Sequence, residues 1–242
     1  MTAAPPPPAA DDGWGAPRAF WLRLRAALER EPALACELLE GLAAVLGTYG
    51  TAVYENRFVV GGVAEQLLGS AARAGGLPVR NVGRLAQGHD LEVSGEDPHQ
   101  PLRLSVKGVF ASSASDLTLL NTQGASDRAW AVPTLVLLRD VGLGYADPGL
   151  LPGKVQVKAD SLRLPLQHLH ELWNTIAGAR PPPPPGQPLP DTPGYPRATQ
   201  WLLPRPVPTA VAAPAREVAS DLVSARVMAS LPRLRPHLQA EQ

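Results

Sequence analysis

"HDLEVSGEDPHQPLRLSVKG" (residues 89–108) is the stretch on which the fold of this chain depends. Apolar and polar side chains alternate in residues 89–94 and again in 101–108, and this period of two is typical of strands with one buried face. The segment between them, 95–100, contains Gly, Asp and Pro, which favour turns. The sequence therefore predicts an antiparallel hairpin with one apolar and one polar side.

The loop length sets the register that we expect between the two strands. If residues 94 and 101 are partners, each pair of opposite residues has numbers that sum to 195. The expected partners are Asp90 with Ser105 and Glu92 with Arg103. We expect the second pair to be an ordinary cross-strand ion pair. Lys107 becomes the diagonal neighbour of Asp90, so an acid, a hydroxyl and a lysine are predicted to meet on the polar face.

Helical periodicity precedes the hairpin. Apolar residues at helical spacing predict two N-terminal helices within residues 18–50. Another helix is expected within residues 54–76, with Glu65 in its middle and a pair of glycines at its end. A short strand around residues 79–82 then leads into the hairpin.

The residues after the hairpin predict further strands and one more helix. The unbroken apolar run 135–138 is typical of a strand covered on both faces, and residues 154–158 alternate as a half-buried strand does. Apolar residues between 162 and 176 recur at steps of four and three, which predicts a helix. The stretch "GLGYADPG" (142–149) is typical of a loop. We therefore predict an α/β fold with a central mixed β-sheet flanked by helices.

Proline-rich segments flank this centre. The chain has 28 prolines and 22 glycines among 242 residues, and the prolines gather toward both ends. Residues 1–17 are expected to be disordered, residues 51–179 to form the core, and residues 180–208 to form an extended linker. A C-terminal helix and tail are expected in residues 209–242. A lone amphipathic helix cannot bury its apolar face, so we expect this helix to dock on the core or on another subunit.

Composition narrows the classes of function. With 22 basic and 22 acidic residues the formal net charge is zero, which gives no electrostatic argument for a large nucleic-acid footprint. The single cysteine, Cys36, provides neither a disulfide nor a cysteine-based zinc site. The sequence has no apolar run long enough for a membrane span and does not begin like a signal peptide. We therefore expect a cytoplasmic protein without membrane contact.

The motif "GHDLEV" followed by "LRLSVKG" resembles the core motif of the PD-(D/E)XK nuclease superfamily. In that superfamily an Asp on one strand and a (D/E)-x-Lys on the next hold a magnesium ion and a water, and many members carry a Glu on the preceding helix. The resemblance covers roughly residues 55–176 and implies a restriction-endonuclease-like core, with helix, strands, helix and strand in this order. It implies that Asp90 is a metal ligand, that Lys107 orients the water, and that Glu65 is an accessory ligand.

Ser105 departs from the superfamily pattern, because it occupies the position of the second metal-binding carboxylate. A neutral hydroxyl is a poor ligand for Mg²⁺, which prefers carboxylate oxygens. Some restriction endonucleases of this superfamily also have S-V-K here and use an acid from the following helix. Asp116, Asp127 and Glu92 are the candidates to replace the missing acid in this chain. Asp116 also fits an ordinary cap or turn residue among serines.

The resemblance implies Mg²⁺-dependent hydrolysis of DNA phosphodiester bonds, in restriction or defence and often by a homodimer. The implied catalytic residues are Lys107, Asp90, Glu65 and Ser105, and the implied metal ligands are Asp90, Glu65 and Asp116. The alternative is a relative that has lost its second acid and is catalytically inactive. Such a protein would be a DNA-binding or assembly subunit that holds a protein partner through the C-terminal helix.

Overall fold

The computed structural model describes residues 15–49, 56–82, 88–94, 101–110, 114–121, 130–138, 142–158, 161–169, 171–174 and 222–239. Three helices come first: α1 (Gly15–Arg30), α2 (Pro32–Thr48) and α3 (Asn56–Ala74). The strands are β1 (Val79–Asn81), β2 (Leu91–Val93), β3 (Leu102–Val109), β4 (Asp116–Asn121), β5 (Thr134–Leu138), β6 (Gly142–Ala146), β7 (Gln156–Lys158), β8 (Ser161–Pro165) and β9 (Glu171–Asn174). Short 3₁₀ helices are η1 (Leu166–His168) and η3 (Arg235–His237), and residues 222–229 form a C-terminal helix.

The strands form two sheets. The main sheet has six strands in the order β1-β2-β3-β5-β6-β9, and a second sheet has three in the order β4-β8-β7. Within the main sheet β2 is antiparallel to β1 and β3, β5 is parallel to β3, and β6 is antiparallel to β5 and β9. This mixed sheet with its helices confirms the predicted α/β class.

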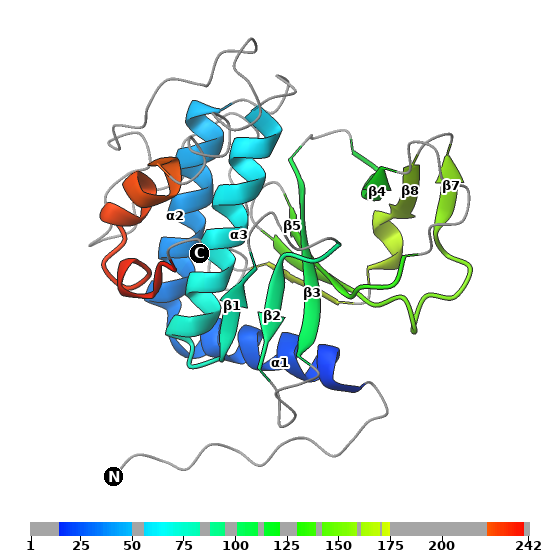
Figure 1. Cartoon of the computed structure of the whole chain (residues 1–242), viewed down its shortest axis with the longest axis horizontal. Helices are drawn as coiled ribbons and strands as arrows, with labels where there is room; N and C mark the ends of the chain where they lie inside the picture. Colours follow the sequence, from blue (N-terminus) through cyan, green and yellow to red (C-terminus); the bar gives the residue numbers. More distant parts are fainter. Residues whose placement is uncertain are drawn as a thin grey trace.

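The main sheet lies between the helices and the second sheet (Figure 1). Leu91, Leu104 and Val106 share one hydrophobic cluster with the apolar residues of α1, α2 and α3. Val109 and Val136, from the other face of the sheet, pack in a separate cluster with leucines of β4 and β8. Because side chains alternate along a strand, the two clusters occupy opposite faces of the main sheet.

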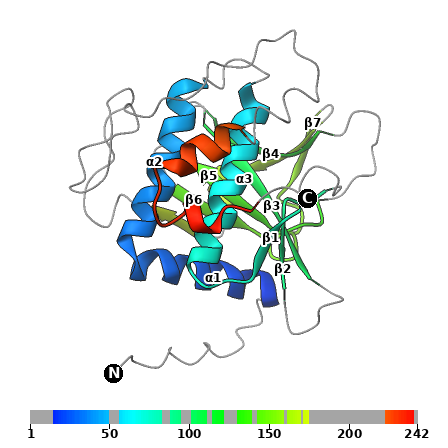
Figure 2. The ribbon, with the colours of Figure 1, turned by 60° about the vertical axis from the view of Figure 1, so that its left-hand side comes forward.

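The C-terminal residues complete the helical layer. Helix 222–229 and η3 lie across α2 and α3 (Figure 2). The side chains that they bury in the helix-facing core are Val223, Val227, Met228, Leu231 and Leu234. The C-terminal helix therefore docks on the core of its own chain, which is one of the two arrangements predicted for it.

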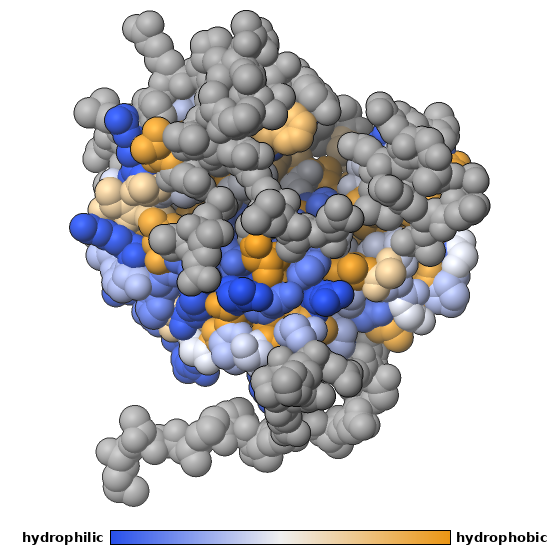
Figure 3. All heavy atoms as spheres, viewed as in Figure 1, coloured by the Kyte–Doolittle hydropathy of each residue, from blue (hydrophilic) through white to orange (hydrophobic). Residues whose placement is uncertain are grey.

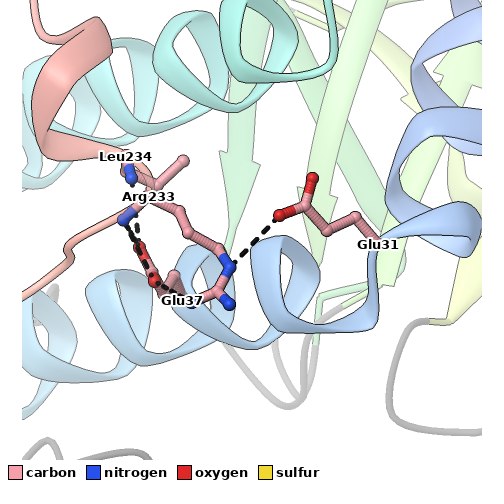
Figure 4. Close-up of polar contacts among 4 residues, drawn as sticks. All are labelled: Glu31, Glu37, Arg233 and Leu234. Atoms are coloured by element: carbon pink, nitrogen blue, oxygen red, sulfur yellow. Dashed lines mark hydrogen bonds and ion pairs between the residues drawn. The ribbon is translucent and has the colours of Figure 1, made fainter.

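A buried carboxylate fastens this C-terminal segment to α2 (Figure 4). Glu37 is 0% exposed and accepts hydrogen bonds from the backbone N–H groups of Arg233 and Leu234, at 2.9 and 3.0 Å. The Arg233 guanidinium also reaches Glu37 and the exposed Glu31. Beyond this point, Arg73 Nε donates to the backbone oxygen of His237 at 2.8 Å. The segment is thus held by specific polar contacts as well as by apolar burial.

Three local predictions are wrong. Residues 154–158 do not form a half-buried strand, because β7 covers only Gln156–Lys158 and all three of its residues are exposed. Residues 162–176 do not form one helix: β8, η1 and β9 occupy this region. Pro165 ends β8, and a proline is poorly tolerated in the interior of a helix. The stretch 142–149 does not begin as a loop either, because its first five residues form β6, all of them buried and paired with β5 and β9.

Several expectations lie outside the described residues. These are the extended linker 180–208 and most of the segment 1–17 that was predicted to be disordered; its last residues, 15–17, are described and begin α1, contrary to that prediction. Within the described residues α1 and α2 contribute to the same hydrophobic cluster as the main sheet, so the two helices share one core with it. None of the helices described here is long and apolar enough to cross a membrane.

Candidate functional site at the β2–β3 hairpin

The hairpin forms with the predicted register. Leu91 pairs with Leu104, Glu92 with Arg103 and Val93 with Leu102, so each pair sums to 195. The Asp90 N–H donates to the Leu104 carbonyl at 2.9 Å, which extends the pairing by one residue. The alternation of apolar and polar residues is sufficient to explain this register, because a slip by one position would bury the charged face.

Asp90, Ser105 and Lys107 meet on the polar face of the hairpin. Asp90 Oδ2 accepts hydrogen bonds from Ser105 Oγ at 2.8 Å and from the backbone N–H of Val106. Lys107 Nζ lies 3.5 Å from the same oxygen. Asp90 Oδ2 therefore takes part in two hydrogen bonds and one ion pair, while no hydrogen bond or ion pair joins Oδ1 to the described residues.

The cluster is accessible although it lies within the sheet. The side chains of Lys107 and Asp90 are 33% and 20% exposed, whereas Ser105 is buried. Ser105 and Lys107 lie beside Thr134 and Val136 of β5 in parallel register. The buried hydroxyl and the neighbouring strand hold Asp90 in place, and the two charged groups remain within reach of a ligand.

Glu65 belongs to a different face of the main sheet. Its helix, α3, packs on the face that carries Leu104 and Val106, whereas Ser105 and Lys107 point to the opposite face. The backbone oxygen of Glu65 accepts a hydrogen bond from Asn81 Nδ2 at 2.9 Å. Its role as an accessory metal ligand stays a prediction.

Asp116 lies in the second sheet. It is the first residue of β4, and its carboxylate lies 3.0 Å from Lys158 Nζ of β7. The predicted alternatives of a cap or turn residue are wrong, since Asp116 is a strand residue in an ion pair. Asp127, the other downstream candidate, lies outside the described residues.

Glu92 does not pair with Arg103, contrary to expectation. Its Oε2 accepts a hydrogen bond from Arg80 of β1, and its Oε1 lies 3.0 Å from Nε2 of the buried His89. These two hydrogen bonds, that from Arg80 first, hold the pKa of the Glu92 carboxyl below its ordinary value. The pairing of β2 with β3 predicts neither contact, because Arg80 lies on β1, the other neighbour of β2, and His89 lies two residues before β2 itself.

The donor set suits Mg²⁺ only in part. Mg²⁺ in proteins is commonly bound by one or two carboxylates, several waters and the phosphates of the substrate. Asp90 would supply one such carboxylate. Among the residues that the structure describes, no three His, Cys, Asp or Glu side chains lie together where they could hold a metal ion. Asp90, Glu65 and Asp116 therefore do not form a single ligand cluster, and an ion held here would depend on water and phosphate oxygens.

Comparisons with known proteins give no relative. No family model matches the chain, and no curated protein or solved structure matches it significantly. The hairpin geometry is therefore the basis for a functional proposal.

Proposed function

We propose that this protein hydrolyses phosphodiester bonds of DNA with Mg²⁺, at the site formed by Asp90, Ser105 and Lys107. The observation that carries the proposal is the 3.5 Å approach of Lys107 Nζ to Asp90 Oδ2 across the β2–β3 hairpin. An acid and a lysine from adjacent strands, on one accessible face, are two of the three groups of the PD-(D/E)XK motif, and Ser105 takes the place of the third.

The strand arrangement supports a restriction-endonuclease-like core. A helix is followed by three antiparallel strands, and β5 then joins β3 in parallel. One difference is found between β3 and β5: the described part of this connection contains β4 rather than the helix that the resemblance implies. The proposal therefore rests on the hairpin and the strand order and not on this connection.

Each group at the site would have a distinct role. Asp90 would hold the ion through Oδ1, and bound Mg²⁺ would polarise a phosphate oxygen and make water a better nucleophile. Lys107 would orient that water and offset the negative charge that gathers on the phosphate. Ser105 would fix the Asp90 carboxylate through its hydrogen bond of 2.8 Å.

The test is cleavage of plasmid DNA by the purified protein with Mg²⁺ or Mn²⁺. Wild type is expected to nick or linearise the plasmid, and Lys107→Ala is expected to lose at least about 100-fold in rate. Lys154→Ala provides a matched control, because Lys154 is an exposed lysine distant in sequence from the hairpin. Equal cleavage by wild type and Lys107→Ala, or no cleavage by either, would exclude this function. Gel filtration of the active protein would test the dimer that cutting both strands suggests.

A second candidate is a subunit that binds DNA or supports an assembly without cleaving. The absence of a cluster of three metal-ligating side chains among the described residues favours it, since Asp90 Oδ2 already takes part in two hydrogen bonds and one ion pair. A protein partner could not use the apolar side of the C-terminal helix, because Val223, Val227 and Met228 are buried against the core of the same chain. Binding of DNA without cleavage in the plasmid experiment would support this candidate.

A further inference from the structure

Three charged side chains form a row across β1, β2 and β3. The register places Arg80 opposite Glu92 and Glu92 opposite Arg103, so the carboxylate stands between two arginines. Ser105 and Lys107 follow Arg103 on the same face of β3, since residues two apart point to one side of a strand. The row therefore borders the Asp90 site directly.

Both oxygens of the carboxylate in this row are engaged by residues other than Arg103. Arg80 bonds to one Glu92 oxygen and His89 lies 3.0 Å from the other. Arg103 is exposed and has no ion pair or side-chain hydrogen bond with any residue that the structure describes. Glu92 therefore does not form an ion pair with Arg103, and the positive charge of Arg103 is available to a ligand.

We propose that Arg103 binds a backbone phosphate of duplex DNA beside the Asp90 site. The proposal rests on the DNA-binding part of the function proposed above. The planar guanidinium matches the oxygens of a phosphate and stays charged. Arg103 and Lys107 are four residues apart on one strand face, about 13 Å along β3. At a rise of about 3.4 Å per nucleotide, a DNA strand lying along β3 would meet the two cations about four nucleotides apart.

The surface in this region suits a polar ligand. Hydrophilic residues gather over β1, β2 and β3 in the middle of the face shown in Figure 3, with hydrophobic residues between them. No surplus of positive charge exists in the whole chain. A small number of cations in fixed positions must therefore supply the attraction for DNA, and Arg103 is one that forms no ion pair with the described residues.

The experiment measures binding of a fluorescent duplex of about 30 base pairs, with Ca²⁺ in place of Mg²⁺, between about 50 and 200 mM salt. Arg103→Ala is expected to weaken binding about tenfold and to lower the slope of log K against log salt by about 1. Arg103→Lys keeps the charge and is expected to keep the slope. Arg23→Ala removes an exposed arginine from α1, on the helical side of the sheet, and is expected to change neither quantity.

The outcomes separate this contact from the cleavage reaction. If Arg103→Ala binds DNA with the affinity and the salt slope of the wild type, the phosphate contact is overturned, even if the wild type cleaves DNA. Arg103-dependent binding by a wild type that does not cleave with Mg²⁺ would support the contact and exclude the nuclease. If the wild type binds no duplex, both the phosphate contact and the nuclease function are overturned. Because Arg103 is exposed, thermal melts are expected to show all variants folded.

Discussion

Lys107 Nζ lies 3.5 Å from Asp90 Oδ2, and the two residues come from adjacent antiparallel strands. The same oxygen accepts the Ser105 hydroxyl and the Val106 N–H. The Asp90 carboxylate is therefore the centre of a small polar network, and each member of this network can be tested separately.

Asp90→Asn is expected to lower the free energy of unfolding by about 1 to 3 kcal/mol, because the amide is a weaker acceptor for the Ser105 hydroxyl and the Val106 N–H. It also removes the charge that Lys107 faces. Urea unfolding of wild type and variant measures the difference. An unchanged midpoint and slope would mean that the network does not contribute to stability.

Ser105→Asp restores a carboxylate at the position where the PD-(D/E)XK motif has one. Two acids side by side repel each other, so the melting temperature is expected to fall by several degrees without metal. Added Mg²⁺ is expected to raise the melting temperature of the variant more than that of the wild type, because a second hard oxygen strengthens binding. Ser94→Asp places a carboxylate at an exposed position of the same hairpin and is the control. An equal response to Mg²⁺ in both variants would contradict the expectation.

Glu37→Gln is expected to destabilise the protein by about 1 to 3 kcal/mol. The buried carboxylate accepts two backbone N–H groups and an arginine, and the neutral amide satisfies them less well. Glu31→Gln is the matched control, because Glu31 meets the same Arg233 but is 50% exposed, and its loss is expected to cost less than about 1 kcal/mol. Chemical unfolding measures the free energy of unfolding of both variants. Equal decreases in the two variants would show that the burial of Glu37 does not add to stability.

Glu40 predicts a pH dependence of stability. Burial, and then the charge of Glu37, raise the pKa of Glu40 from 4.5 to about 7, and Glu40 Oε2 has no hydrogen-bond partner among the described residues. Between these two pKa values the folded protein holds a proton that the unfolded chain has released. The free energy of unfolding should therefore fall as the pH rises from about 5 to 8.

Glu40→Gln removes this titrating carboxyl group. The loss in free energy of unfolding between about pH 5 and 8 is therefore expected to be smaller than in wild type by about 1 to 3 kcal/mol. Urea unfolding at several pH values measures this pH dependence. Glu29→Gln, on the exposed side of α1, is the control. The same decline in Glu40→Gln as in wild type would show that another group is responsible.

The hairpin was predictable from sequence because two local constraints agree there. Alternation fixes which side chains face the core, and the loop length fixes the register, so Asp90, Ser105 and Lys107 could be placed together. Glu92 shows the limit of this reasoning. Its true partners, Arg80 and His89, depend on which strand flanks β2 on its other side and on the local backbone.

The regions that were wrongly predicted have sequence patterns that fit two types of secondary structure. Steps of four and three between 162 and 176 suit a helix, yet Leu162 and Leu164 also alternate as buried residues of β8. Pro165 was the local signal against a continuous helix. In β6, Gly142 and Gly144 suggest a loop, but they alternate with Leu143 and Tyr145, which are buried in the helix-facing core.

The contact between Glu37 and Arg233 joins positions 196 residues apart. A nascent chain on the ribosome would have to expose the apolar stripe of α2 and α3 until residues 222–239 have been synthesised. Assembly of the helical layer is therefore expected to follow translation rather than accompany it, with chaperones as the natural protection for that interval.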